Sequence, residues 1–155
     1  MATRPDFFLY DRIGRLAAVV EVKNRRGTSS QWAAELRRDL LAHFETFRGA
    51  PIFVLVTPDR VYLWKNAPTD LQEDTPPAPP DYEVDAVQVF GPYLERPSRR
   101  LSLEEISRPA LELVVMSWLG DLIRQTPEAR GSGGLEGSGL REAARDGRIA
   151  DPLAA

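Results

Sequence analysis

The chain has 155 residues, of which 43% are hydrophobic and 28% are charged, and its formal net charge is −3. These values are typical of a single folded domain with its own core. The absence of cysteine excludes disulfides, thiol chemistry and cysteine-ligated zinc. No apolar run reaches the length of about 18 residues that a membrane span needs, and the first residues lack the apolar stretch of a signal peptide. We therefore expect a cytoplasmic protein.

The charge is distributed unevenly along the chain. Residues 1–65 carry eleven Lys and Arg against seven Asp and Glu, a net charge of +4, whereas residues 66–155 carry nine against sixteen, a net charge of −7. A basic segment of this kind is a pointer to nucleic-acid contact. The excess of +4 supports such a contact without establishing it.

The first predicted elements are two strands, residues 6–10 and 16–23, joined by a tight turn. A four-residue loop, 12–15, would place Asp6 directly opposite Glu21 on one face of the hairpin. A five-residue loop would shift the register by one and send Asp6 to the other face. The position of Asp6 therefore depends on the turn.

Charged residues gather at the end of this hairpin. Glu21 and Lys23 lie two positions apart and share a face with Asp6, although sheets rarely bury charges without a reason. Facing carboxylates with Cβ atoms about 4.5–5.5 Å apart can share one Mg²⁺, and a lysine beside them can assist an attacking water. The alternative is a surface Glu–Lys pair at a strand end, with Asp6 capping a turn.

Further elements follow along the chain. The spacing of apolar residues predicts a helix from about residue 28 to residue 47, with its buried stripe formed by Trp32, Leu36, Leu40, Phe44 and Phe47. Apolar runs predict strands at 52–56 and 60–65. The proline-rich residues 66–81 predict an extended surface connection. Residues 85–95 fit a strand or a short helix.

The last part of the chain is predicted to be mainly helical. Ser102 and Glu105 have the spacing of a capping box before a helical segment, and Pro109 opens a helix that reaches about Gln125. Glycine and serine in residues 126–155 predict a flexible linker followed by a short helix near its end. We therefore expect one α/β domain, 1–125, with a mixed sheet of about four strands flanked by helices.

The run from Pro5-Asp6 to Glu21-Val22-Lys23, followed by a helix, resembles the PD-(D/E)XK nuclease superfamily. It is similar in particular to the nuclease domain at the start of type I restriction motor subunits and to related small uncharacterised bacterial proteins. The resemblance extends more loosely to about Lys65. It implies a restriction-endonuclease-like fold and a metal-dependent nuclease that hydrolyses phosphodiester bonds in DNA.

The resemblance also implies residue roles. Asp6 and Glu21 would ligate Mg²⁺ or Mn²⁺ together with the backbone carbonyl of Val22. Lys23 would orient the water and stabilise charge on the scissile phosphate. Gln31 would contact the site or the nucleic acid, but Thr28 and Gln31 also have the spacing of a capping box, and the two interpretations remain open.

Four arginines close to the motif are expected to contact phosphates: Arg25, Arg26, Arg37 and Arg38. For each one, a solvated loop or helix face is the alternative. DNA is therefore the expected partner, and a two-fold dimer would provide the two sites that duplex cutting needs. His43, the single histidine, is expected to be structural rather than a general base.

The chain departs from the family pattern in one respect. A helix normally precedes the Pro-Asp strand, but only four residues precede Pro5. We expect the C-terminal helices to pack in its place, where Glu104, Glu105 or Glu112 could supply a further carboxylate. The alternative is a catalytically inactive nuclease-fold protein that acts as a nucleic-acid-binding or protein-assembly module.

Overall fold

The computed structural model describes residues 4–96, 99–130 and 132–150. The strands are β1 Phe7–Tyr10, β2 Leu16–Val22, β3 Ile52–Val56, β4 Arg60–Lys65, β5 Tyr82–Asp85, β6 Glu95–Arg96, β7 Arg99–Arg100 and β8 Arg148–Ala150. The helices are α1 Ser30–His43, α2 Ala86–Leu94, α3 Arg108–Arg124, α4 Pro127–Arg130 and α5 Leu140–Ala144, with 3₁₀ turns η1 Glu45–Phe47 and η2 Ser132–Gly134.

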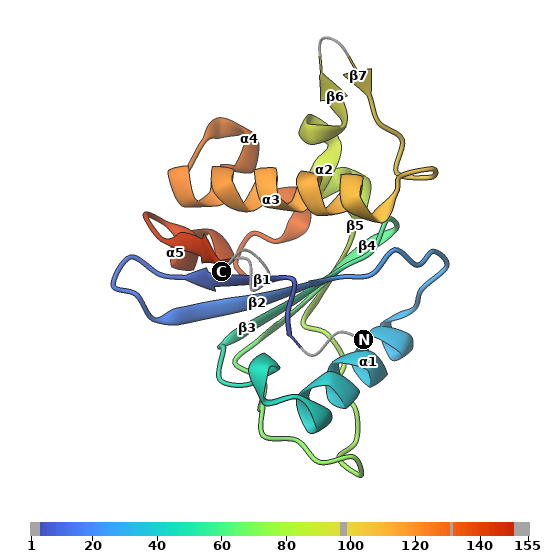
Figure 1. Ribbon diagram of the computed structural model, residues 1–155, viewed down its shortest axis with the longest axis vertical. Helices are drawn as coiled ribbons and strands as arrows, with labels where there is room; N and C mark the ends of the chain where they lie inside the picture. The colour runs from blue at the N-terminus through green and yellow to red at the C-terminus, as the bar shows by residue number, and fades with distance from the viewer. Residues whose placement is uncertain (1–3, 97–98, 131, 151–155) are drawn as a thin grey trace.

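The centre of the fold is a mixed sheet with the strand order β5-β4-β3-β2-β1-β8 (Figure 1). Helices α2 and α3 cover one face and α1 covers the other. The α/β class predicted from sequence is confirmed, but the described sheet has six strands rather than about four, because β5 and β8 extend its two edges. None of the described helices is long and apolar enough to span a bilayer.

The β1–β2 hairpin sets the position of the charged residues. Phe7 pairs with Val20 and Phe8 with Val19, so the same register continued by one residue places Asp6 opposite Glu21. Asp11 N–H donates to the carbonyl of Arg15 at 2.8 Å, so Arg15 pairs with Asp11. The loop is therefore 12–14, one residue shorter than the predicted loop 12–15. A β-bulge between Leu9 and Tyr10 adds one residue to β2. The register shift from the bulge cancels the shift from the shorter loop, so Asp6 and Glu21 lie opposite each other as predicted.

Helix α1 connects β2 to the parallel strand β3. Its buried residues are Ala33, Ala34, Arg37, Leu40 and Leu41, whereas Trp32, Leu36 and Phe44 of the predicted stripe are only partly buried. Its N-cap is Ser29, whose hydroxyl accepts a hydrogen bond from Trp32 N–H at 3.1 Å. The predicted capping box of Thr28 and Gln31 is therefore wrong. The Thr28 hydroxyl instead lies 2.8 Å from the Tyr62 hydroxyl, which joins the start of α1 to β4.

The opposite face of the sheet is covered by α2 and α3, where Phe90 and Trp118 pack edge to face with ring centroids 5.4 Å apart. The ambiguous segment 85–95 is mostly α2. The capping box predicted at Ser102 does not start a helix, because α3 begins later with Ser107 as its N-cap. Residues 101–107 form an irregular segment that leads α3 past the end of β2.

The C-terminal segment is packed rather than flexible. Leu135, Leu140 and Ala144 are buried in the core beneath α3, and β8 pairs with β1 at the sheet edge. Gly133 has a φ of +57°, and a Cβ atom there would lie 2.5 Å from the backbone of Gln88. Glycine at this position permits close packing against α2, so the linker expected over 126–155 is wrong for the described part of that range.

The proline-rich connection, 66–81, runs over the face that α1 covers and contains neither helix nor strand, as predicted. Trp64 Nε1 donates to the carbonyl of Ala78 at 2.9 Å, and Leu71 is buried against the same cluster. This connection therefore seals one side of the core.

Candidate functional site

A charged cluster lies where β1 begins and β2 ends. Glu21 belongs to an apolar strand, so the register of β2 turns its carboxylate inward, and the residue is 0% exposed. Lys23 Nζ lies 3.3 Å from Glu21 Oε2, and its side chain is 26% exposed. Asp6 N–H donates to Glu21 Oε1 at 3.2 Å, and Val22 N–H donates to Asp6 Oδ2 at 2.7 Å. The hairpin therefore brings together four residues that the sequence assigns to the metal site.

Burial dominates the electrostatics of this cluster. Burial, with a smaller contribution from the nearby Asp6 carboxyl, raises the pKa of Glu21 from 4.5 to about 8, and Lys23 opposes this rise. The atom Glu21 Oε2 is buried and has no hydrogen-bond partner among the described residues. Its contact with the Lys23 ammonium is an ion pair without a hydrogen bond. A buried carboxylate in this condition is stabilised by an added cation.

Helix α3 adds a second cation to the cluster. Arg108 Nη2 lies 3.3 Å from Asp6 Oδ1, and Arg108 Nε donates to Glu112 Oε1 at 2.9 Å. The contact between Arg108 and Asp6 joins residues 102 positions apart in the chain. The sequence gives no local signal for it, since Arg108 stands in an ordinary helix start before Pro109.

Two further contacts hold the start of α3 beside the cluster. Arg26 Nη2 donates to the carbonyls of Leu103 and Ile106 at 3.0 and 3.3 Å, and Asn24 Nδ2 donates to Ile106 at 3.4 Å. These hydrogen bonds therefore join the loop after β2 to the segment before α3, beside the charged cluster. Arg26 is partly committed to this structural role, although the residue remains exposed.

The three acidic residues considered as extra ligands are separated in the structure. Glu112 contacts Arg108 and reaches the cluster only through that guanidinium. Glu104 lines a pocket of about 980 Å³, and Glu105 is exposed in the turn that begins at Ser102. The structure therefore brings Glu112 closest to Asp6, as the partner of a cation.

Gln31, Arg25 and Arg38 lie outside the cluster. Gln31 is exposed and donates to Glu35 Oε1 at 3.3 Å, on its own helix. The guanidinium of Arg25 lies 5.5 Å from the ring centroid of Trp32. Arg38 pairs with its neighbour Asp39, with Nε to Oδ1 at 3.0 Å. Gln31 and Arg25 lie on the outer surface, whereas Arg38 is partly buried and its Nη1 donates to the carbonyl of Thr75 at 3.4 Å.

The phosphate contact predicted for Arg37 is wrong, because the residue is buried in the core. It is only 2% exposed, and its guanidinium lies 5.7 and 5.5 Å from the ring centroids of Phe53 and Trp64. Its Nη2 donates to the carbonyl of Pro68 at 2.9 Å. Burial lowers the pKa of Arg37 to about 10. Arg37 follows Ala33 by one helical turn on the face of α1 that is buried in the structure, one position away from the predicted stripe of Trp32 and Leu36.

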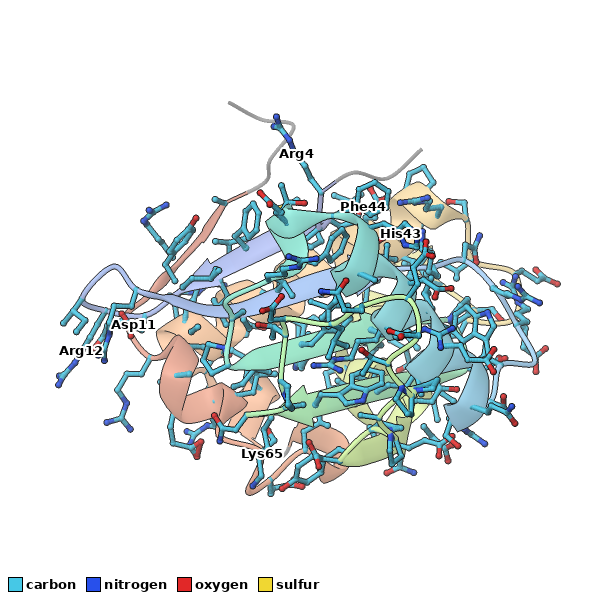
Figure 2. All side chains as sticks on the ribbon, turned by 90° about the horizontal axis from the view of Figure 1, so that it is seen from below. Arg4, Asp11, Arg12, His43, Phe44 and Lys65 are labelled. Atoms are coloured by element: carbon cyan, nitrogen blue, oxygen red, sulfur yellow. The ribbon has the colours of Figure 1, made fainter. Side chains whose placement is uncertain are left out.

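His43 lies at the end of α1 beside Phe44 on the exposed face of the helix (Figure 2). Its Nδ1 is 2.8 Å from the carbonyl of Asp39, and its Nε2 contacts Glu73. The hydrogen bond to Asp39 and the contact with Glu73 raise the pKa of the imidazole. These contacts fit the structural role expected for His43.

The pocket that Glu104 lines is separate from the charged cluster. It lies between the loop after β2, the β3–β4 turn and α2, and neither Asp6, Glu21 nor Lys23 contributes to its lining. Two of its four acidic lining residues, Asp59 and Asp85, are already engaged, by Gly27 N–H and by Arg60. The cluster is the better candidate site, because its buried carboxylate lacks a full complement of partners.

The residues of the cluster fit a divalent cation in donor type. Carboxylate and carbonyl oxygens are the ligands that Mg²⁺ prefers. The described residues contain no group of three or more acidic, histidine or cysteine side chains arranged around one point. The resemblance implies two carboxylates and the Val22 carbonyl as the protein ligands. The buried, unsatisfied Glu21 Oε2 is the observation that favours a cation here.

Comparison with known proteins adds no assignment: no protein-family model, curated protein or solved structure matches the chain.

Proposed function

We propose that this chain is a divalent-metal-dependent nuclease of the PD-(D/E)XK type that hydrolyses phosphodiester bonds in DNA. The observation that supports this proposal is the meeting of Asp6, Glu21 and Lys23 at the end of one hairpin, with the Glu21 carboxylate fully buried. Burying a carboxylate is costly unless a charge or hydrogen bonds compensate it. A site for a cation accounts for that cost.

Each residue has a distinct role in the proposed reaction. Asp6 and Glu21 would hold Mg²⁺ or Mn²⁺ with the carbonyl of Val22, and the cation would supply polarisation of phosphate oxygens and a lower pKa of water. The Lys23 ammonium, which lies 3.3 Å from Glu21 Oε2, would orient the water and stabilise charge on the phosphate.

Hydrolysis requires that one P–O ester bond breaks as the oxygen of water bonds to phosphorus. The water loses one proton to solvent, and the departing oxygen gains one to become a hydroxyl. The products are one phosphate monoester end and one hydroxyl end. No oxidant or further reactant is needed.

DNA would approach along the loop that follows Lys23. Arg25 and Arg26 are exposed there, and Arg38 lies on the next helix. Contacts from such residues to phosphates position a duplex without reading its sequence. The proposal includes a two-fold dimer, which would supply a second site for the second strand, and the cytoplasmic location expected from the sequence.

A second candidate is a non-catalytic nuclease-fold module that binds nucleic acid or assembles with proteins. The observation that favours it is the engagement of both Asp6 oxygens by protein donors, Oδ2 by Val22 N–H and Oδ1 by Arg108. In that case the charged cluster is a closed network that fixes β1, β2 and α3 relative to one another.

Cleavage of supercoiled plasmid and of single-stranded DNA, with Mg²⁺ or Mn²⁺, separates the two candidates. We expect metal-dependent cutting by the wild type, and a loss of about 100-fold or more in Lys23→Ala and Asp6→Asn. Lys65→Ala, at an exposed lysine that ends β4, is the matched control and should cut normally. Absence of cutting by the folded wild type would favour the binding module, and cutting that survives both substitutions would refute the assigned residues.

A further inference from the structure

Arg108 and its partner Glu112 bring charged groups from the C-terminal half of the chain to the cluster. Its guanidinium spans two acids, with Nη2 at 3.3 Å from Asp6 Oδ1 and Nε at 2.9 Å from Glu112 Oε1. Its side chain is 45% exposed, whereas Glu21 is fully buried. Arg108 therefore forms the solvent-facing side of the cluster, where a substrate would arrive.

The two contacts of Arg108 differ in kind. The contact with Glu112 is short and lies within one helix, at the i,i+4 spacing that favours such pairs. The contact with Asp6 is longer and joins two separate parts of the fold. A divalent cation bound to Asp6 would repel the guanidinium and take the oxygen that it contacts. The Glu112 contact would survive, so Arg108 would stay in place with its Nη groups released.

A released guanidinium is suited to phosphate. Its planar arrangement of N–H donors matches two phosphate oxygens, and one side remains fixed by Glu112. The summed formal charge of the site also becomes more favourable for phosphate when a cation binds. With every side chain ionised, Asp6, Glu21 and Glu112 outnumber Lys23 and Arg108 by one negative charge, and a bound divalent cation brings the sum to +1. The site would therefore attract a phosphodiester only after it had bound the cation.

We propose that Arg108 is a catalytic arginine that exchanges Asp6 for the scissile phosphate when a cation binds. Glu112 acts as its positioning residue. This inference rests on the proposed nuclease function and deepens it. It assigns a substrate contact to a residue outside the Asp6-to-Lys23 motif, and it gives an order of binding in which the cation precedes the DNA.

The test compares Arg108→Gln with Arg124→Gln. Arg124 lies at the other end of α3 and makes a similar contact within the helix, with Nη2 at 2.9 Å from Asp121 Oδ1, so it is a matched control. Mn²⁺ affinity is measured by titration calorimetry without DNA. Affinity for a short duplex is measured in Ca²⁺, and plasmid cleavage is measured in Mg²⁺. Urea unfolding of each variant verifies that it is folded.

We expect Arg108→Gln to bind Mn²⁺ several-fold more tightly than the wild type, because a competing cation has left Asp6. The same variant should bind the duplex about 10-fold more weakly and cut it about 100-fold more slowly. Arg108→Lys, which retains the charge and loses the planar fork, should recover part of the cleavage. Glu112→Gln should raise the KM for DNA and leave Mn²⁺ affinity unchanged.

Several results would overturn the inference. Normal cleavage by Arg108→Gln, alongside an active wild type, would remove Arg108 from the reaction and leave the nuclease proposal intact. Weaker Mn²⁺ binding by Arg108→Gln would contradict the exchange of partners. A folded wild type that neither binds Mn²⁺ nor cuts DNA would remove the nuclease proposal and this inference together.

Discussion

Glu21→Gln is the substitution that tests the raised pKa of the buried Glu21 carboxyl most directly. Burial raises the pKa of Glu21 from 4.5 to about 8 in the folded protein. Between those values the folded protein retains a proton that the unfolded chain has released. The free energy of unfolding of the wild type should therefore fall as the pH rises through this window. Glutamine has no such proton, so the variant should lack this part of the pH dependence.

The magnitude follows from the two pKa values. Each tenfold change in proton affinity corresponds to about 1.4 kcal/mol. The difference between 4.5 and about 8 then corresponds to about 3 kcal/mol between pH 4 and pH 7, and to about 5 kcal/mol once the pH exceeds both values. The variant should gain stability relative to the wild type by these amounts, whatever its stability at pH 4.

The assay is urea unfolding at pH 4, 5.5, 7 and 8.5 in the presence of EDTA. Glu45→Gln, at an exposed glutamate in η1, is the control and should follow the wild type at each pH. Mg²⁺ should then stabilise the wild type by about 2.7 kcal/mol at one hundred times its Kd, and stabilise Glu21→Gln by about 1.4 kcal/mol or less, the value for a tenfold weaker Kd. A stability difference that stays constant with pH would refute the raised pKa and the reasoning built on it.

Three further predictions concern the fold. Arg37→Ala should lower the free energy of unfolding in urea by about 3 kcal/mol or more, and Arg37→Met by less, because methionine still fills the space between Phe53 and Trp64; equal losses would contradict this packing role. Leu140→Ala should cost about 2–5 kcal/mol in the same assay, whereas a flexible segment would show no change. The pKa of His43, followed by NMR, should lie above 6.5 and fall in Glu73→Gln. The His43 contribution to stability is present below pH 6.5 and lost as the pH rises through the folded pKa. An unchanged pKa in Glu73→Gln would exclude the Glu73 contact.

The sequence was sufficient to place Glu21 and Lys23 on one face, because a strand period of two fixes which residues share a face, but the placement of Asp6 opposite Glu21 depended on the turn. The prediction was reached with the wrong loop length. A bulge beside Tyr10 compensated for it, and bulges have no reliable sequence signature. The helix over α1 and strands β3 and β4 were predicted from apolar periodicity, which is strong in long buried elements.

Other features depend on tertiary packing and could not be read from local patterns. Arg108 meets Asp6 across 102 positions of the chain, and only the docking of α3 brings them together. Glycine and serine around Gly133 indicate flexibility when composition alone is considered. In the fold, the missing Cβ atom allows close contact with Gln88, and Leu135 and Leu140 anchor the segment in the core.

The proposed function depends on Asp6 and Glu21 holding one divalent cation between them. Titration calorimetry with Mn²⁺ on the metal-free wild type, Asp6→Asn and Glu21→Gln measures this directly. We expect one cation per wild-type chain and a loss of affinity of at least about tenfold in each variant, since each removes one of the two anionic ligands. Equal affinity in all three proteins, or no binding by the folded wild type, would contradict the metal site and the nuclease proposal with it.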